Sequence, residues 1–84
     1  MNINDFDVLN RISSIINSEF GSNDAAIARY LIAHIRRSSE INVAAITRDA
    51  FVTRSAVRRF CNRLGYQSLS DLKEDLLSQS FQAT

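Results

Sequence analysis

The chain has 84 residues, of which 45% are hydrophobic and 23% are charged. This length fits one domain, residues 1–84, and this hydrophobic content supports a packed core, so disorder is not expected. A net charge of only +1 excludes a general polyanion-binding tail. The chain has no proline and only two glycines, and its apolar residues lack strand-type alternation, so the composition predicts an all-α fold.

The basic residues are unevenly distributed along the chain. Five of the ten lie between residues 42 and 64, where Asp49 is the single acid, so this stretch carries a local charge of +4. Such asymmetry in a small domain favours one basic docking face. No signal peptide and no apolar run of membrane-spanning length is present, so we expect a cytoplasmic protein without a membrane segment.

The first helix is predicted over about residues 5–19, with Asn4 or Asp5 as its N-cap and Gly21 as its C-terminal stop. Its apolar residues cover about half of the helix circumference, which is wider than one docking face needs. Two interpretations stay open: burial on two sides within its own domain, or a helix shared with a second subunit. The apolar set is Phe6, Val8, Leu9, Ile12, Ile15, Ile16 and Phe20.

The second helix is predicted over about residues 24–37, capped by Ser22, Asn23 or Asp24. Its core stripe is expected to be Ile27, Ala28, Leu31 and Ile35, with Arg36 and Arg37 in the last turn, where cations suit the helix dipole. His34 is the only histidine, and no cysteine pair is near it, so we expect a structural histidine and no metal site.

Residues 42–65 predict a helix-turn-helix unit, preceded by a polar connection over residues 38–41. Asn42 caps a helix over residues 43–50, residues 51–53 form the turn, and Thr53 caps a second helix over residues 54–64 that Gly65 ends. The buried set of the first is expected to be Val43, Ile46, Thr47 and Ala50, and that of the second Val57, Phe60, Cys61 and Leu64. Cys61 therefore belongs to the core rather than to a catalytic site.

Capping-box spacing between Ser68 and Asp71 opens a fifth helix over about residues 69–80. Leu69, Leu72, Leu76 and Leu77 are expected to face the core, and the polar tail over residues 78–84 is expected to fray. The sequence thus predicts a five-helix domain with a homeodomain-like helix-turn-helix.

The exposed face of the helix over residues 54–64 is the candidate DNA-binding site. An apolar stripe on one side leaves arginine, serine and asparagine on the other, the residue types that contact guanine, phosphate and adenine. Arginines on a helix are often only its solvated face, but four of them without an acid repel one another unless an anion is present. The candidates are Thr53, Arg54, Ser55, Arg58, Arg59, Asn62 and Arg63. The first three and Arg58 lie nearest the base-reading end, and the others are better placed for backbone contact.

Several stretches resemble the RpiR-type family of bacterial transcription regulators. VRRFCNRLGY at residues 57–66 and SDLK at residues 70–73 resemble the family's V-V-R-F-C-K-K-L-G-F and F-S-D-L-K blocks, and the R-F-C-x-x-L-G-[FY] core is fairly specific. Upstream, IARYL at residues 27–31 resembles I-A-x-Y-I, and residues 42–53 resemble S-I-x-E-L-A-x-x-A-G-V-S. The resemblance spans roughly residues 9–77.

This resemblance implies a regulator of sugar or sugar-phosphate metabolism that binds operator DNA, usually as a dimer or higher oligomer. Family members normally continue into a C-terminal sugar isomerase (SIS) domain that senses phosphosugars. Since no such domain follows here, the chain is either an N-terminal fragment or a naturally short relative, and no effector site or cofactor is expected in these residues. The chain departs from the family in having Phe51 for the turn glycine and Thr47 for a small alanine. A bulky residue is costly at positive φ, so we expect the turn to take another backbone shape and to tilt the following helix.

The leading hypothesis is therefore a sequence-specific DNA-binding domain. The alternative is a helical protein-interaction or homodimerisation module, motivated by the broad apolar face of the first helix. An enzyme is a distant third, because the sequence shows no paired acids on one face, no histidine beside a nucleophile and no glycine-rich phosphate loop. No catalytic, metal or cofactor-binding residue is expected.

Overall fold

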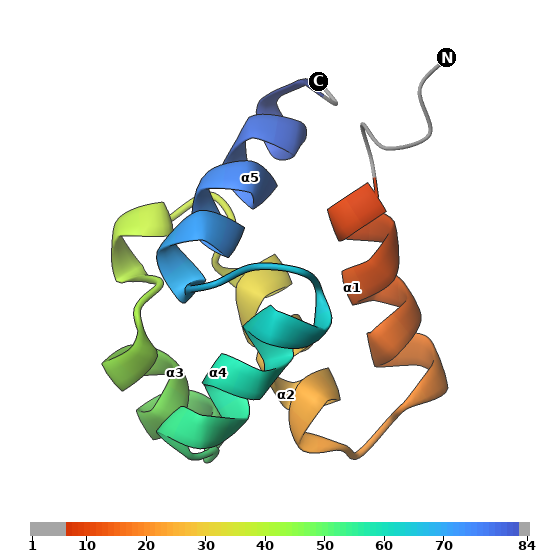
Figure 1. Ribbon diagram of the computed structural model, residues 1–84, viewed down its shortest axis with the longest axis vertical. Coiled ribbons are helices and arrows are strands. Elements are labelled where there is room, and N and C mark those ends of the chain that lie inside the picture. The colour runs from red at the N-terminus through yellow and green to blue at the C-terminus, as the bar shows by residue number, and fades with distance from the viewer. Residues whose placement is uncertain (1–6, 83–84) are drawn as a thin grey trace.

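A computed structural model describes residues 7–82, and over this range the chain forms five α-helices and one short 3₁₀ helix, with no strand. The elements are α1 (Asp7–Ser18), α2 (Asn23–Ala33), η2 (Ser38–Glu40), α3 (Val43–Ala50), α4 (Arg54–Arg63) and α5 (Leu69–Gln82). The helix pair α3 and α4 occupies one end of the molecule, and α1 and α5 rise from it on either side (Figure 1). The predicted all-α class with five helices is confirmed.

Side-chain caps fix the starts of four helices. The backbone N–H groups of Ala45 and Ala56 donate to Asn42 Oδ1 at 2.8 Å and to Thr53 Oγ1 at 3.0 Å. Each cap satisfies one of the N–H groups that have no partner within the helix. Ser22 and Ser68 cap α2 and α5 in the same way, from Ala25 and Asp71, at 3.0 and 3.2 Å. The caps predicted for α3, α4 and α5 are thus confirmed, and Ser22 is the cap among the three candidates for α2.

The core is a single cluster to which every α-helix contributes. Each α-helix supplies fully buried large side chains, and Ile41 adds one from the segment before α3. Those from the helices are Val8, Ile12, Ile27, Leu31, Ile46, Val57, Phe60, Leu72 and Leu76. Helix α1 buries Val8, Ile12 and Ile15 here and packs Leu9 and Ile16 against the cluster. The apolar face of α1 is therefore largely satisfied within its own domain.

Several expectations about burial were wrong. Phe20 is 86% exposed rather than part of the α1 core face, because it lies beyond the end of that helix, where the Arg29 guanidinium stands 5.7 Å from its ring centre. In α3, Val43, Thr47 and Ala50 are only half-buried, and Ala45 is buried in their place. Ile35 is likewise half-buried. The caps predicted at Asn4 and Asp5, and the apolar Phe6, lie outside the described residues.

Helix boundaries also differ at two places. Helix α2 ends at Ala33, so Arg36 and Arg37 lie outside it and do not face its C-terminal dipole. His34 is the C-cap; its ring stacks on Tyr30 with centres 4.0 Å apart, and its Nδ1 lies 2.9 Å from the Tyr30 carbonyl oxygen. Helix α5 runs to Gln82, two residues beyond the prediction, instead of fraying from residue 78.

Long-range polar contacts tie α5 to the rest of the molecule. Lys73 Nζ donates to the carbonyl oxygens of Ser38 at 3.1 Å and Ile41 at 3.0 Å, which joins α5 to the segment that leads into α3. The hydroxyl of Tyr66 donates to the Asp75 carboxylate. These contacts fix the start of α5 beside the helix-turn-helix.

Candidate nucleic-acid interface

Helix α4 is fixed by a cap at its start, a glycine motif at its end and a buried apolar stripe along one side. Its apolar stripe, Val57, Phe60, Cys61 and Leu64, is buried as predicted, and Ala56 joins it. At its end Gly65 takes φ +94°, its N–H donates to the Asn62 carbonyl at 3.0 Å, and the N–H of Tyr66 donates to the Cys61 carbonyl at 2.9 Å. This is the Schellman arrangement, in which a left-handed glycine satisfies the last carbonyls of a helix.

The opposite side of α4 is open to solvent. All seven candidate residues are exposed: Thr53, Arg54, Ser55, Arg58, Arg59, Asn62 and Arg63. Arg54, Arg58 and Arg59 make no hydrogen bond or ion pair with any residue of the described range 7–82. Three guanidinium groups within two turns of one helix therefore face water with their charge uncompensated by a neighbouring acid.

Arg63 differs from the other candidates because acids engage its guanidinium. It forms an ion pair with both carboxylate oxygens of Glu19 and a second pair with Asp24 at 2.6 Å. The hydrogen bond and charge of Arg63 lower the pKa of Glu19. The structure thus does not group Arg63 with Arg54, Arg58 and Arg59; Arg63 joins the end of α4 to the α1–α2 connection.

Arg11 of α1 reinforces the same junction. Its guanidinium donates to the carbonyl oxygens of Leu64 and Arg63, both at 3.0 Å. A cation at these carbonyls offsets the negative end of the helix dipole. Arg11, Glu19 and Asp24 were not predicted to lie at this site, because only the packing of α1 and α2 on α4 brings them to its C-terminal end.

The turn between α3 and α4 keeps a left-handed residue. Phe51 has φ 57° and ψ 46°, with its side chain 90% exposed. The expectation that a bulky residue would force another backbone shape was therefore wrong: the three-residue turn requires this conformation, and the aromatic ring avoids a clash by pointing into solvent. Thr47, the other departure, is accommodated because its hydroxyl donates to the Ala44 carbonyl at 2.9 Å.

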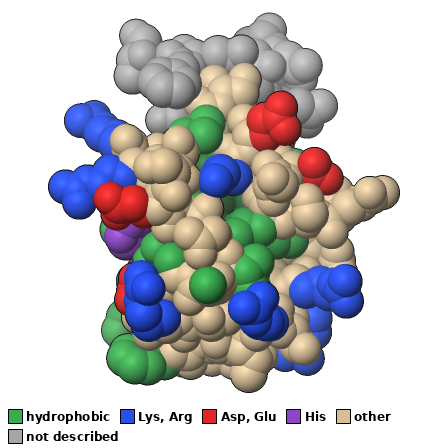
Figure 2. Space-filling view, turned by 90° about the vertical axis from the view of Figure 1, so that its left-hand side faces the viewer, with side chains coloured by type: hydrophobic (Ala, Val, Ile, Leu, Met, Phe, Trp, Pro, Cys, Tyr) green, Lys and Arg blue, Asp and Glu red, His purple; other side chains and the backbone are tan. Residues whose placement is uncertain are grey.

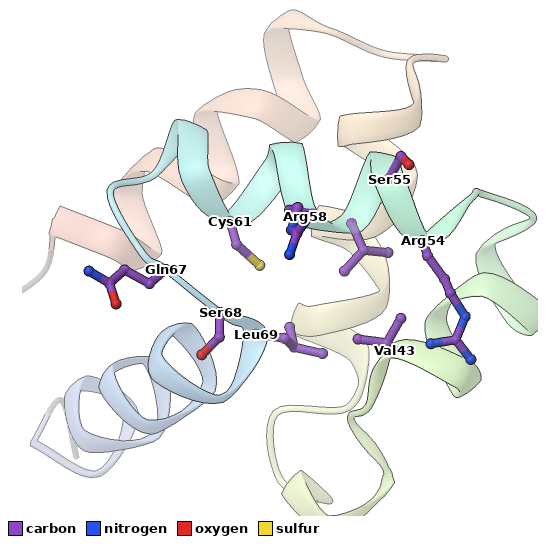
Figure 3. Close-up of a pocket in the computed structure, with 9 residues that line it drawn as sticks. Val43, Arg54, Ser55, Arg58, Cys61, Gln67, Ser68 and Leu69 are labelled. Carbon is purple, nitrogen blue, oxygen red and sulfur yellow. The ribbon is translucent and has the colours of Figure 1, made fainter.

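A recess of about 340 Å³ opens beside α4, on the side of Arg54 and Arg58. Its wall includes Gln67 and Ser68 from the loop before α5, Leu69 from α5 and Val43 from α3 (Figure 3). The sulfur of Cys61 points toward it from α4, and Val43 and Leu69 approach each other from the opposite side (Figure 3). Its nine lining residues include two arginines and no acid. On the face drawn in Figure 2, apolar side chains show through the middle, with basic and some acidic side chains around them.

The surroundings of Cys61 and His34 give these side chains structural roles rather than catalytic ones. Cys61 is 1% exposed, and burial raises the pKa of its thiol to about 11, so the thiolate that reacts as a nucleophile is scarce near neutral pH. His34 is occupied by its contacts with Tyr30. Within residues 7–82, no group of three or more His, Cys, Asp or Glu side chains is placed to hold a metal ion.

Comparison with known proteins identifies one family. Residues 6–84 match the model of the helix-turn-helix domain of the rpiR family. No curated protein matches the chain, and no solved structure does. None of the helices over residues 7–82 is long and apolar enough to cross a membrane.

Proposed function

Since the chain belongs to the rpiR family of helix-turn-helix domains, and is thus a DNA-binding domain of the transcription-regulator type, we propose that α4 is its recognition helix and reads operator sequence in the major groove. The observation that carries this proposal is the exposed, acid-free side of α4 with Arg54, Arg58 and Arg59. A row of guanidinium groups without acid partners favours the phosphate-rich groove of a duplex, where counterion release adds affinity.

The residues of this face take different roles. Thr53, Arg54, Ser55 and Arg58 lie at the N-terminal end of α4, the end that usually contacts base edges in this motif. Arg59 and Asn62 lie farther along and contact the sugar–phosphate backbone. Arg63 supports the C-terminal end of α4 instead of contacting DNA, because its guanidinium already pairs with Glu19 and Asp24.

The biological setting follows the family resemblance. The domain acts in the cytoplasm on genes of sugar or sugar-phosphate metabolism. A phosphosugar effector acts through an SIS domain rather than through the helices described here. These assignments rest on the RpiR-type blocks at residues 57–66 and 70–73.

A salt titration tests DNA reading directly. Binding to the DNA upstream of its own gene is compared with binding to a scrambled duplex of equal length, over a range of salt concentrations. A steep salt slope with preference for the upstream DNA supports the proposal, since phosphate contacts set the slope and base contacts set the preference. Absence of binding to either duplex at low salt contradicts it.

The role of Arg58 has its own test. Arg58→Ala is expected to weaken specific binding by about 1–3 kcal/mol and to relax preference at one base pair, as loss of a bidentate base contact does. The matched control is Arg36→Ala, which removes an exposed arginine that follows α2 and makes no hydrogen bond or ion pair with another residue of the range 7–82. Equal effects of both variants would remove Arg58 from the base-reading set.

A homodimer is the second proposal, because helix-turn-helix readers commonly dimerise to match two half-sites. Only Leu9 and Ile16 of the α1 apolar set remain half-buried among the described residues, so α1 offers a narrower contact strip than its sequence suggested. Sedimentation at several protein concentrations tests the dimer, and a monomer at the highest concentration would contradict it.

A further inference from the structure

The recess beside α4 continues the face assigned to DNA. Arg54, Ser55 and Arg58 belong to both, since they line the recess and lie on the exposed side of α4. The other wall is the loop before α5, where Gln67 and Ser68 are exposed. A duplex that meets α4 from this side therefore also meets the loop before α5.

The lining has two chemical parts. Val43, Val57, Cys61 and Leu69 form an apolar floor, whereas arginine, serine and glutamine side chains form the rim. Arg54 and Arg58 supply two positive charges, and no residue of the lining supplies a negative one. This pattern complements a ligand that has an apolar ring face next to an anionic group.

A deoxyribose and its adjoining phosphate have this composition. We propose that one sugar–phosphate strand of the bound duplex runs through the recess, with a sugar over the floor and a phosphate between Arg58 and the α5 side of the rim. Gln67 and Ser68 thereby become DNA-backbone contacts outside the helix-turn-helix unit. This inference rests on the proposed DNA-reading function and extends it to a second element.

Phosphate contacts fix the register of a protein on DNA without reading sequence. The Lys73 bonds to the carbonyls of Ser38 and Ile41 hold α5 against the segment before α3. The start of α5 is thus held relative to the helix-turn-helix, so a contact there restrains how deeply and at what angle α4 enters the groove.

Ser68→Asp tests the proposal without removing the cap of α5. Aspartate caps helices as well as serine does, and the Ser68 hydroxyl oxygen already accepts the N–H of Asp71. The new negative charge should repel the strand in the recess. Ser22→Asp is the matched control, because Ser22 caps α2 by the same bond and stands outside the lining. Gln67→Glu adds a charge to the same rim without touching any cap.

Affinity for mixed-sequence duplex DNA is measured at low salt for all four proteins, with thermal unfolding as the check on folding. We expect Ser68→Asp and Gln67→Glu each to weaken binding roughly tenfold, since like charges brought together at an interface oppose association. Ser22→Asp should change it much less. The loss should be similar for upstream and scrambled DNA, as a backbone contact requires.

The outcomes distinguish the proposed DNA reading by α4 from the proposed backbone contact in the recess. Wild-type binding with equal losses in Ser68→Asp and Ser22→Asp would mean a general charge effect and would overturn the recess contact alone. Wild-type binding that Ser68→Asp and Gln67→Glu leave unchanged would do the same. No binding by the wild-type domain would overturn DNA reading and the recess contact together.

Discussion

Phe51 shows how a single backbone requirement can outweigh a residue's preference. Its left-handed conformation costs an L-residue on the order of 1–2 kcal/mol, and its ring recovers little of this because it is 90% exposed. In the sequence, the only sign that this position needs positive φ is the glycine that the RpiR-type family has there. The packing of α3 and α4 on either side of the turn offsets this conformational free energy.

Phe51→Gly is therefore expected to stabilise the domain, by about 1 kcal/mol, because glycine adopts positive φ without a Cβ clash. The urea midpoint should rise with an unchanged m-value. Phe51→Ala is the control: it removes the ring but keeps the Cβ and should not reproduce the gain. A lower midpoint for Phe51→Gly would show that the ring contributes a contact that outweighs the strain.

The raised pKa of Cys61 predicts that the free energy of unfolding depends on pH, with a defined sign. Burial raises its pKa from 9.0 to about 11 in the folded state, so between these values the unfolded chain has lost its thiol proton while the folded chain keeps it. The free energy of unfolding should fall as pH rises through this window, by about 1.4 kcal/mol per unit of pKa difference at most. Urea titrations at pH 8 and near pH 11 measure it.

Cys61→Ala separates this contribution from that of Tyr30, whose pKa burial also raises. The variant should start from a lower stability because it leaves a cavity, but it should lose less stability between the two pH values. An identical loss in wild type and variant would contradict the assignment to Cys61.

At the scale of elements, the starts of helices were predictable and some ends were not. Asn42, Thr53 and Ser68 act on N–H groups three residues away, so their caps follow from local sequence. Helix α2 ends at Ala33, where His34 is the C-cap, and α1 ends at Ser18, which leaves Phe20 exposed. Helical periodicity alone does not set where these helices end.

Some features of the candidate site were also predictable from the sequence, and others were not. The exposed side of α4 follows from helical periodicity, which separates Arg58 from Phe60 and Cys61 by angle alone. The engagement of Arg63 by Glu19, 44 residues earlier in the chain, does not follow from it. Nor does the recess that Gln67 and Arg58 line together.

The Arg63 junction makes a prediction that runs against simple electrostatics. Glu19→Gln removes a negative charge, which alone would strengthen DNA binding. If Glu19 acts by holding the end of α4 through Arg63, the variant should instead weaken binding, with an unchanged salt slope. Arg63→Gln should then weaken binding less in the Glu19→Gln background than in the wild type, where it removes the pairs with both Glu19 and Asp24. Stronger binding by Glu19→Gln would show that the junction does not position α4.

At the scale of the whole molecule, all five α-helices share one core, so the domain should unfold in a single cooperative step. Phe60 of the proposed recognition helix lies fully buried in that core, 0% exposed. The stability of the fold and the presentation of the α4 arginines therefore depend on the same packing.

Phe60→Ala is expected to destabilise the domain by roughly 3–5 kcal/mol, through lost burial and the cavity left behind. Phe20→Ala makes the same chemical change at a side chain that is 86% exposed, and should cost less than about 1 kcal/mol. Circular dichroism on heating or in urea measures both. Similar losses would contradict the single-core description.

The unpaired charges of Arg54, Arg58 and Arg59 also bear on how fast the domain finds its target. Because acids hold Arg63, the open guanidinium groups concentrate toward the N-terminal end of α4, the end proposed to read bases, and a polyanion should be drawn to that end first. Salt should therefore slow arrival on DNA, whereas the lifetime of the complex should depend on short-range contacts around the helix. The same arrangement should orient the domain before contact, so that a larger share of collisions with DNA leads to binding.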